Sequence, residues 1–410
     1  MTLARSQTDK TVPDEVGVAF VRLGLAIGRH LPGYVDTYFG PADIAQRVEA
    51  EGALPASELA ALADGLAQEV ATYASLDPVR REYLKGEVAA MQTTTRMLQG
   101  EALEFVDEVR ALYGVAPGWV DETVFTEAHR VLADLLPGPG TLTERVQAFR
   151  RSMRIPIAVA APMITRLAAE FRERARAAFP LPPGEDCVFS FVRGQPWTAY
   201  NWYEGEGRSR IEIDEDHPLY VYQLPEIVAH EAYPGHHTEH AIKEQVLYRE
   251  QSRLEHSVIL GHVPSSLVSE GIAEHAVDVI VQPGELIHWY GEILQEAGMP
   301  RAEAARVDEF SRALLPLARV ADNQLLLSNG RGASDDEVIA YGLRYALNTA
   351  EDQQRLLRFM KDPLWRSYGF NYSLGHHVVE TYLGVSRDRI TAFARLLQEP
   401  LTPGQLLAAA

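Results

Sequence analysis

The chain has 410 residues, of which 46% are hydrophobic and 23% are charged, an ordinary composition for a globular protein with an extensive core. The formal net charge of −19 argues against binding to nucleic acid or to an anionic membrane, because basic patches recognise both. No run of about 18 apolar residues is present, so we expect no transmembrane helix.

Apolar residues recur at helical spacing through most of the first 180 positions. This pattern predicts helices over 14–31, 56–74, 77–100, 144–153 and 156–179, with a break at the glycine- and proline-containing segment 33–43. The one cysteine, Cys187, follows this region in an apolar run and is expected to be a packed, inert thiol. A single cysteine and the lack of an apolar leader favour a cytoplasmic protein.

The pattern changes after "PLPPGE". Three short segments rich in β-branched and aromatic residues, 186–194, 198–205 and 208–216, predict a small antiparallel sheet. Helical spacing returns at Leu219 and continues to the end. We therefore expect a mainly α protein with one small antiparallel sheet before the histidine-rich segment, with residues 1–180 and 181–410 packed as one body.

Histidines are concentrated in one part of the chain: nine of the 13 lie between His217 and His288. Histidine is the commonest metal ligand. The segment "HEAYPGHH" begins like the zinc signature H-E-x-x-H, in which two histidines on one helical face bind the metal and the glutamate acts as general base. Here His230 and His236 are six residues apart, so an unbroken helix would leave their side chains roughly 120° apart.

Pro234 and Gly235 account for the unusual spacing. Proline lacks the amide hydrogen and clashes with the carbonyl four residues earlier, so a regular helix is disrupted here. Deleting both residues leaves a standard H-E-x-x-H, which predicts a two-residue bulge that brings His230 and His236 back onto one face. Two alternatives for the second ligand remain open, namely His237 and an i, i+4 pair of His236 with His240.

A third ligand is expected from "LVSEGIAEHAVDVI", which predicts one amphipathic helix over 267–280. Glu270, Glu274 and Asp278 are four residues apart and share one face. In zinc peptidases with a glutamate ligand, that ligand comes from a later helix, and an acid one turn further on supports a liganding histidine. We therefore predict one zinc ion bound by His230, His236 and Glu270, with Glu274 supporting a histidine.

The motifs "HEAYPGHH" and "SEGIAEHA" resemble the H-E-x-x-P-G-H and S-E-G-x-A motifs of the domain of unknown function 885 family, over roughly residues 180 to 385. That family comprises largely helical bacterial zinc metallopeptidases of the gluzincin type. The resemblance implies that His230, His236 and Glu270 bind zinc and that Glu231 is the general base. It also implies, from "NYSLGHH" against the family's Y-K-x-G, that Tyr372 is a transition-state donor. The family's glutamine three residues after the second histidine is Glu239 here.

These residues predict hydrolysis of peptides by zinc-activated water, with Glu231 moving the proton and Tyr372 or His376 stabilising the oxyanion. The predicted strand 209–214 is a candidate edge for pairing with an extended peptide. Two alternatives stay open at this point: a zinc hydrolase of another amide or ester, and a non-catalytic zinc protein. Glu231 argues against the last, because a structural site has no need of a carboxylate beside its first ligand.

Overall fold

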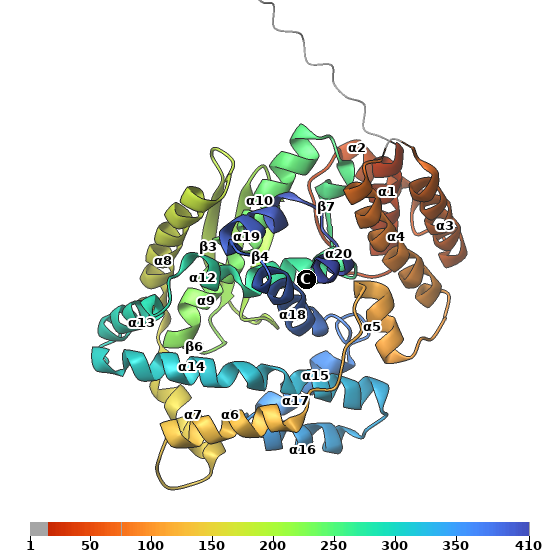
Figure 1. Cartoon of the computed structure of the whole chain (residues 1–410). Coiled ribbons are helices and arrows are strands. Elements are labelled where there is room, and N and C mark those ends of the chain that lie inside the picture. The colour runs from red at the N-terminus through yellow and green to blue at the C-terminus, as the bar shows by residue number, and fades with distance from the viewer. Residues whose placement is uncertain (1–14, 75, 410) are drawn as a thin grey trace, which may run out of the picture.

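The protein was described from a computed structural model, in which residues 15–74 and 76–409 are placed (Figure 1). Helices make up most of the described chain, as expected from the sequence. The N-terminal helices are α1 (Glu15–Gly28), α2 (Ala42–Glu51), α3 (Ala56–Thr72), α4 (Pro78–Leu98), α5 (Phe105–Tyr113), α6 (Glu122–Leu135), α7 (Leu142–Ser152) and α8 (Ile157–Ala178). The five helices predicted in this region are confirmed, with ends shifted by a few residues.

The second half carries the motifs. Its helices are α9 (Leu224–Glu231), α10 (His236–Lys243), α11 (Pro264–Glu274), α12 (Ala276–Ile280), α13 (Glu285–Glu296), α14 (Ala304–Ala318), α15 (Val320–Leu325), α16 (Asp335–Tyr345), α17 (Ala350–Lys361), α18 (Phe370–Gly384), α19 (Arg389–Gln398) and α20 (Pro403–Ala408). The single helix predicted over 267–280 is wrong in one respect, because it ends at Glu274 and restarts after His275.

The hydrophobic core falls into two clusters. One is formed by α1 to α4, on the upper right of Figure 1, with Leu254, Val258, Leu260 and Val263 from the second half of the chain. The other contains most of the remaining buried hydrophobic residues from Phe105 onward. The two core clusters divide earlier in the chain than the expected boundary between residues 1–180 and 181–410. That boundary stays a prediction. No described helix is long and apolar enough to span a bilayer.

The predicted sheet is present but not purely antiparallel. It consists of β3 (Asp186–Val192), β4 (Ala199–Gly205) and β5 (Arg208–Asp214), in the order β3-β5-β4. β5 pairs antiparallel with β4 and parallel with β3. The prediction of an all-antiparallel sheet is therefore wrong, because β5 inserts between the two earlier strands.

Burial explains this order. Ile211 and Ile213 of β5 are completely buried, whereas Val188 of β3 is 60% exposed. The strand with the most buried residues thus occupies the centre, where both neighbours cover it. The segment 209–214, expected to be an edge, is the central strand, and the edges are β3 and β4. Cys187 on β3 packs against the core, and burial raises its pKa to about 12, which agrees with the expectation of a packed, inert thiol.

Two short strand pairs that the sequence pattern did not predict complete the described fold. β1 (Val35–Tyr38) pairs antiparallel with β7 (Val258–Leu260), and β2 (Arg154–Ile155) pairs antiparallel with β6 (Leu219–Tyr220). β1 comes from the segment 33–43, in which only a break was expected. It brings the N-terminal helices into contact with the sheet beside the histidine motif, where it contributes to the site.

Candidate metal centre

The histidine motif lies at the junction of α9 and α10, which are two separate helices. Across this junction the amide of Gly235 donates to the carbonyl of Ala229 (2.9 Å), and that of Thr238 donates to the carbonyl of Ala232 (3.2 Å). Each hydrogen bond spans six residues, where a regular helix spans four. The two extra residues predicted from the spacing are therefore confirmed, although the helix is interrupted outright rather than bulged.

Gly235 is required by space. A Cβ atom there would lie 2.5 Å from the carbonyl carbon of His230 and overlap the carbonyl oxygens of His230 and Ala229. Its φ of −75° is accessible to any residue, so close approach of the backbone, and not an unusual φ, selects glycine. Pro234 precedes it in a cis peptide with Tyr233. Pro-Gly thus turns the chain tightly enough to stack the start of α10 against the end of α9.

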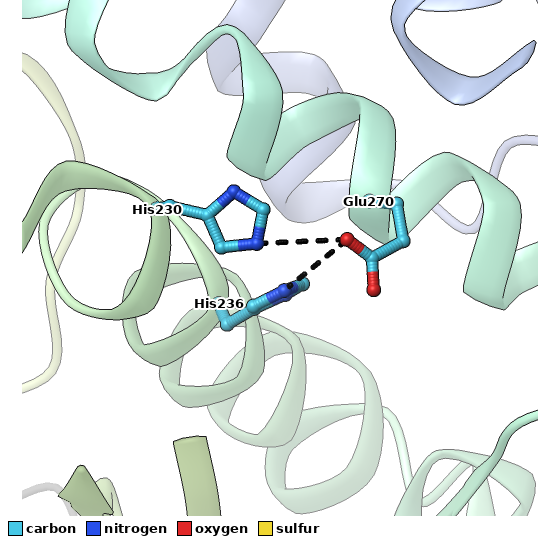
Figure 2. A group of neighbouring side chains, drawn as sticks. All are labelled: His230, His236 and Glu270. Atoms are coloured by element: carbon cyan, nitrogen blue, oxygen red, sulfur yellow. Dashed lines mark ion pairs between the residues drawn. The ribbon is translucent and has the colours of Figure 1, made fainter. Parts of the chain in front are cut away.

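This junction brings three ligand atoms together (Figure 2). The ring centroids of His230 and His236 are 4.8 Å apart. Oε2 of Glu270, from α11, lies 3.5 Å from Nε2 of His230 and 3.8 Å from Nε2 of His236. Ligand atoms around one tetrahedral zinc lie roughly 3.4 Å apart. His230, His236 and Glu270 therefore form a group that could hold a metal ion.

The chemistry of the group also fits a cation. Oε2 of Glu270 is buried and has no hydrogen-bond partner, an arrangement that is unfavourable unless a cation satisfies the oxygen. Burial lowers the pKa of His230, but the neighbouring carboxylates of Glu270, Glu231 and Glu274 outweigh it and raise that pKa to about 9. The carboxylates thus give the cavity a field that favours positive charge, whether a proton or a metal ion.

The predicted supporting acid, Glu274, lies beside the group, and a tyrosine hydroxyl holds Glu270. Oε1 of Glu270 accepts a hydrogen bond from the hydroxyl of Tyr368 (2.7 Å), which leaves Oε2 free to face the histidines. Oε1 of Glu274 is 3.7 Å from Nδ1 of His230, on the ring side opposite Glu270. This distance is an ion pair rather than a hydrogen bond, and it places Glu274 where a carboxylate orients a liganding histidine.

A second support, which the sequence analysis missed, lies behind His236. Nδ1 of His236 is 3.2 Å from the hydroxyl of Ser269, which donates to Glu239 (2.5 Å). Lys243 donates to the other oxygen of Glu239 (2.6 Å). The i, i+4 spacing of Glu239 and Lys243 is the only trace of this chain in the sequence. Glu239 thus holds the hydroxyl of Ser269 beside Nδ1 of His236.

The alternative second ligands lie elsewhere. His237 is completely buried, with Nδ1 at 2.8 Å from the hydroxyl of Ser209 and Nε2 at 3.0 Å from Glu185. His240 stacks on His236 with ring centroids 5.9 Å apart and is not part of the group. Burial lowers its pKa to about 3, so the ring is neutral. The geometry therefore agrees with His236 as the partner of His230.

Glu231, the predicted base, lines the cavity beside the group and is 8% exposed. Its backbone carbonyl accepts a hydrogen bond from the side-chain amide of Asn201 on β4 (2.6 Å), which fixes the end of α9. Burial raises the pKa of the Glu231 carboxyl. A carboxylate with a raised pKa that faces a cavity can accept and return a proton more readily than an exposed one.

Of the two predicted oxyanion donors, only Tyr372 lines the cavity. It lies on α18 with its ring stacked 6.5 Å from that of His230. The charge of Glu270 raises the pKa of Tyr372, so its hydroxyl keeps its proton. His376, one turn later, stacks on His275 at 4.3 Å and is exposed outside the cavity lining. The structure therefore removes His376 from the candidate site.

The glycines of the two motifs let α11 and α18 cross in contact. A Cβ on Gly271 would lie 2.6 Å from the carbonyl carbon of Gly375, and a Cβ on Gly375 would lie 2.8 Å from the amide nitrogen of Gly271. Neither position admits a side chain without moving a helix. This crossing brings Tyr372 on α18 to the same cavity as Glu270 on α11.

A cavity of about 620 Å³ opens beside the three ligand residues. Its walls are rich in aromatic side chains, namely Phe39, Tyr83, Trp197, Tyr200, Trp202, Phe359, Trp365, Tyr368 and Tyr372. Four consecutive residues of the edge strand β4, 199–202, also line it. A volume of this size is typical of sites that enclose small ligands.

The sequence matches no protein-family model and no curated protein. Two crystal structures are similar in fold. One, titled as a "putative lipoprotein" from Colwellia psychrerythraea, has a TM-score of 0.51 at 16% identity over 98% of this chain and 76% of its own. The other, a "putative lipoprotein of unknown function" from Shewanella oneidensis, has a TM-score of 0.47 at 12% identity over 96% and 82%. The first of these likenesses is informative about the fold alone.

Proposed function

We propose that the protein is a zinc-dependent metallopeptidase, in line with the motif resemblance to the domain of unknown function 885 family. The observation that carries this proposal is the convergence of His230, His236 and Glu270 beside Glu231 at a cavity. Two histidines and a glutamate are a known ligand set of catalytic zinc, which keeps a fourth position for water or substrate. We place the protein in the cytoplasm as part of the same proposal.

When bound, zinc lowers the pKa of water to about 7 and polarises a carbonyl oxygen. Glu231 accepts the proton of the attacking water as the water oxygen bonds to the carbonyl carbon of the peptide. As the carbon–nitrogen bond then breaks, Glu231 returns that proton to the leaving amine. Its buried position suits this double role, since a raised pKa brings the acid and base forms closer in energy.

Tyr372 serves as the donor to the developing oxyanion. Four tyrosines line the cavity; Tyr83 stacks on His256, and the hydroxyls of two others are already engaged. The hydroxyl of Tyr368 donates to Glu270, and that of Tyr200 donates to Asp36. The hydroxyl of Tyr372 has no such carboxylate partner and is the one free to turn toward a reacting carbonyl.

The edge strand β4 supports a peptide as the substrate. One side of β4 pairs with β5, and no described strand pairs with the other. Because residues 199–202 line the cavity, an extended peptide placed there meets an edge with backbone groups available for strand addition. This role was expected of β5 and passes to β4, because β5 is the central strand.

The structural alternative, in which zinc only holds helices together, is disfavoured by the cavity. A structural site is closed by protein ligands on all sides. Here the three ligand residues face a space that also receives Glu231 and Tyr372. Hydrolysis of a non-peptide amide or ester would use the same residues, so substrate profiling separates it from the proposal.

The test combines metal analysis with a peptide-library screen on wild type, Glu231→Gln and Glu296→Gln. Glu296 is an exposed residue at the end of α13 and serves as the matched control. We expect one zinc per chain in all three proteins and peptide cleavage that falls by at least about 100-fold only in Glu231→Gln. Cleavage that survives in Glu231→Gln would refute the role of Glu231. Zinc-loaded protein that cleaves esters or other amides but no peptide would favour the alternative.

A further inference from the structure

The charges that line the cavity are unequal. Five carboxylates line it, Asp36, Glu231, Glu239, Glu244 and Glu270, against a single lysine or arginine, Lys243. A peptide presents charge to an exopeptidase at one of its ends, as an ammonium at the N-terminus or a carboxylate at the C-terminus. The way in which these cavity groups are already paired indicates which end the site accepts.

Lys243 is not free to bind a carboxylate. Its ammonium group donates to Glu239 at 2.6 Å, and Glu239 in turn accepts from Ser269 behind His236. Binding a substrate carboxylate at Lys243 would break a buried ion pair that orients a proposed zinc ligand. The cavity lining therefore offers no uncommitted lysine or arginine to a peptide C-terminus.

Four of the carboxylates are also committed. Glu270 belongs to the metal group, Glu231 faces the same cavity as the proposed base, and Glu239 is paired with Lys243. Glu244 accepts from Arg249 at 2.7 Å. Asp36 differs from all of these, because the interaction that the structure gives it is a hydrogen bond from the neutral hydroxyl of Tyr200.

Asp36 also lies beside the edge strand β4, in the cavity that contains the metal group. β1 carries it, and its link to Tyr200 joins β1 to the edge strand β4. Asp36 and Tyr200 line the same cavity as His230, His236 and Glu270. In a peptide, the α-amino nitrogen is two covalent bonds from the carbonyl carbon of the first residue, a span of about 2.5 Å from standard bond lengths. A carboxylate that binds this nitrogen must therefore share the cavity of the metal group, as Asp36 does.

We propose that Asp36 binds the free α-ammonium group of the substrate, so that the protein removes residues from the N-terminus of peptides. This inference rests on the proposed function and adds the mode of cleavage. Tyr200 holds one oxygen of the Asp36 carboxylate and leaves the other to the ammonium group. The aromatic walls of the cavity then receive the first side chain.

The test measures binding, so that it does not depend on turnover. Zinc-loaded wild type is titrated by calorimetry with phenylalanine hydroxamate, with 3-phenylpropanohydroxamate, which lacks the amine, and with 6-aminohexanohydroxamate, which carries a distant amine. The same titrations use Asp36→Asn, which retains an acceptor for the Tyr200 hydroxyl. Asp43→Asn, an exposed aspartate on α2 outside the cavity lining, is the matched control.

We expect wild type and Asp43→Asn to bind phenylalanine hydroxamate about 10-fold to 100-fold more tightly than the probe without an amine, the range for one charge-assisted hydrogen bond. Asp36→Asn should bind the two probes equally with its zinc content unchanged. An amine preference that is missing in wild type, or that persists in Asp36→Asn, refutes the role of Asp36 alone. Tighter binding of the distant amine refutes cleavage at the N-terminus. If no hydroxamate binds, the proposed function fails and this inference fails with it.

Discussion

Replacing Gly375 by alanine tests whether the crossing of α11 and α18 sets the geometry of the site. The added Cβ would lie 2.8 Å from the amide nitrogen of Gly271 and would overlap the carbonyl oxygen of Leu267. Ordinary non-bonded contacts of carbon are about 3.5–4.0 Å. The two helices must therefore separate by about 1 Å, or one of them must distort.

The magnitude follows from two opposing effects. Overpacking of a well-packed contact costs about 1–3 kcal/mol, and the higher helix propensity of alanine offsets up to about 1 kcal/mol of it. A net loss of roughly 1–2 kcal/mol in the free energy of unfolding results. Tyr372 moves with α18, and a displacement of about 1 Å near reacting groups lowers turnover by about 100-fold.

Gly384→Ala is the matched control, because it lies on the same helix, where a Cβ would meet only a side-chain oxygen of Glu380 at 4.0 Å. Denaturant unfolding, zinc content and turnover of a peptide substrate are compared for the two variants. We expect Gly384→Ala to match wild type or to be slightly more stable. Equal stability and turnover of Gly375→Ala and Gly384→Ala would refute the argument from close helix contact.

Three further predictions concern the metal ligands and their supports. Deleting residues 234–235 should reduce zinc affinity less than His236→Ala does, because the shortened segment carries a regular H-E-x-x-H. Equilibrium dialysis against a zinc chelator compares the zinc affinities of the two variants. A larger loss in the deletion variant would contradict the view that two residues are inserted into this motif. Glu270→Gln should weaken zinc binding by about 10-fold or more and Glu274→Gln by less, since only the first removes a charged ligand. Equal losses of zinc affinity in the same dialysis would contradict the assignment of Glu270 as ligand and Glu274 as support of His230. Burial would raise the pKa of Glu185, but hydrogen bonds from buried partners outweigh it and lower the pKa from 4.5 to about 2. The carboxylate therefore stabilises the fold above pH 4.5, and this stability is lost as the pH falls from 4.5 toward 2. The thermal unfolding temperature of wild type should fall more steeply between pH 4.5 and pH 2 than that of Glu185→Gln. Parallel plots of unfolding temperature against pH for the two proteins would contradict this.

The local parts of the site could be predicted from the sequence because short-range rules fix them. The spacing of His230 and His236, with proline and glycine between them, is enough to infer two inserted residues, and hydrogen bonds spanning six residues bear this out. The helix that carries Glu270 and Glu274 follows from apolar periodicity. Its end at Glu274 did not follow, because the periodic pattern continues through His275 without a helix-breaking residue.

The parts that depend on distant contacts could not be predicted. Asp36 reaches the cavity only because β1 pairs with β7, more than 200 residues later, and no local pattern marks that pairing. The position of β5 could not be predicted either. Its own residues predict a strand, but its place in the centre of the sheet depends on how many of its residues are buried compared with β3 and β4. Gly271 and Gly375 look like ordinary motif glycines until two helices far apart in sequence are seen to touch there.

An interrupted helix can carry a metal ligand only if the interruption is itself rigid, and this junction is held in two ways. Its backbone keeps hydrogen bonds across the inserted residues, so the break leaves few unpaired groups. On the face away from the cavity, Tyr233 and His237 both bind the buried carboxylate of Glu185, at 2.7 Å and 3.0 Å. His237 is the neighbour of His236, so anchoring its ring in the core fixes the direction in which His236 points. The inserted Pro-Gly and the buried Glu185 therefore act together. The first brings His236 back beside His230, and the second anchors the neighbouring His237 so that His236 keeps its direction.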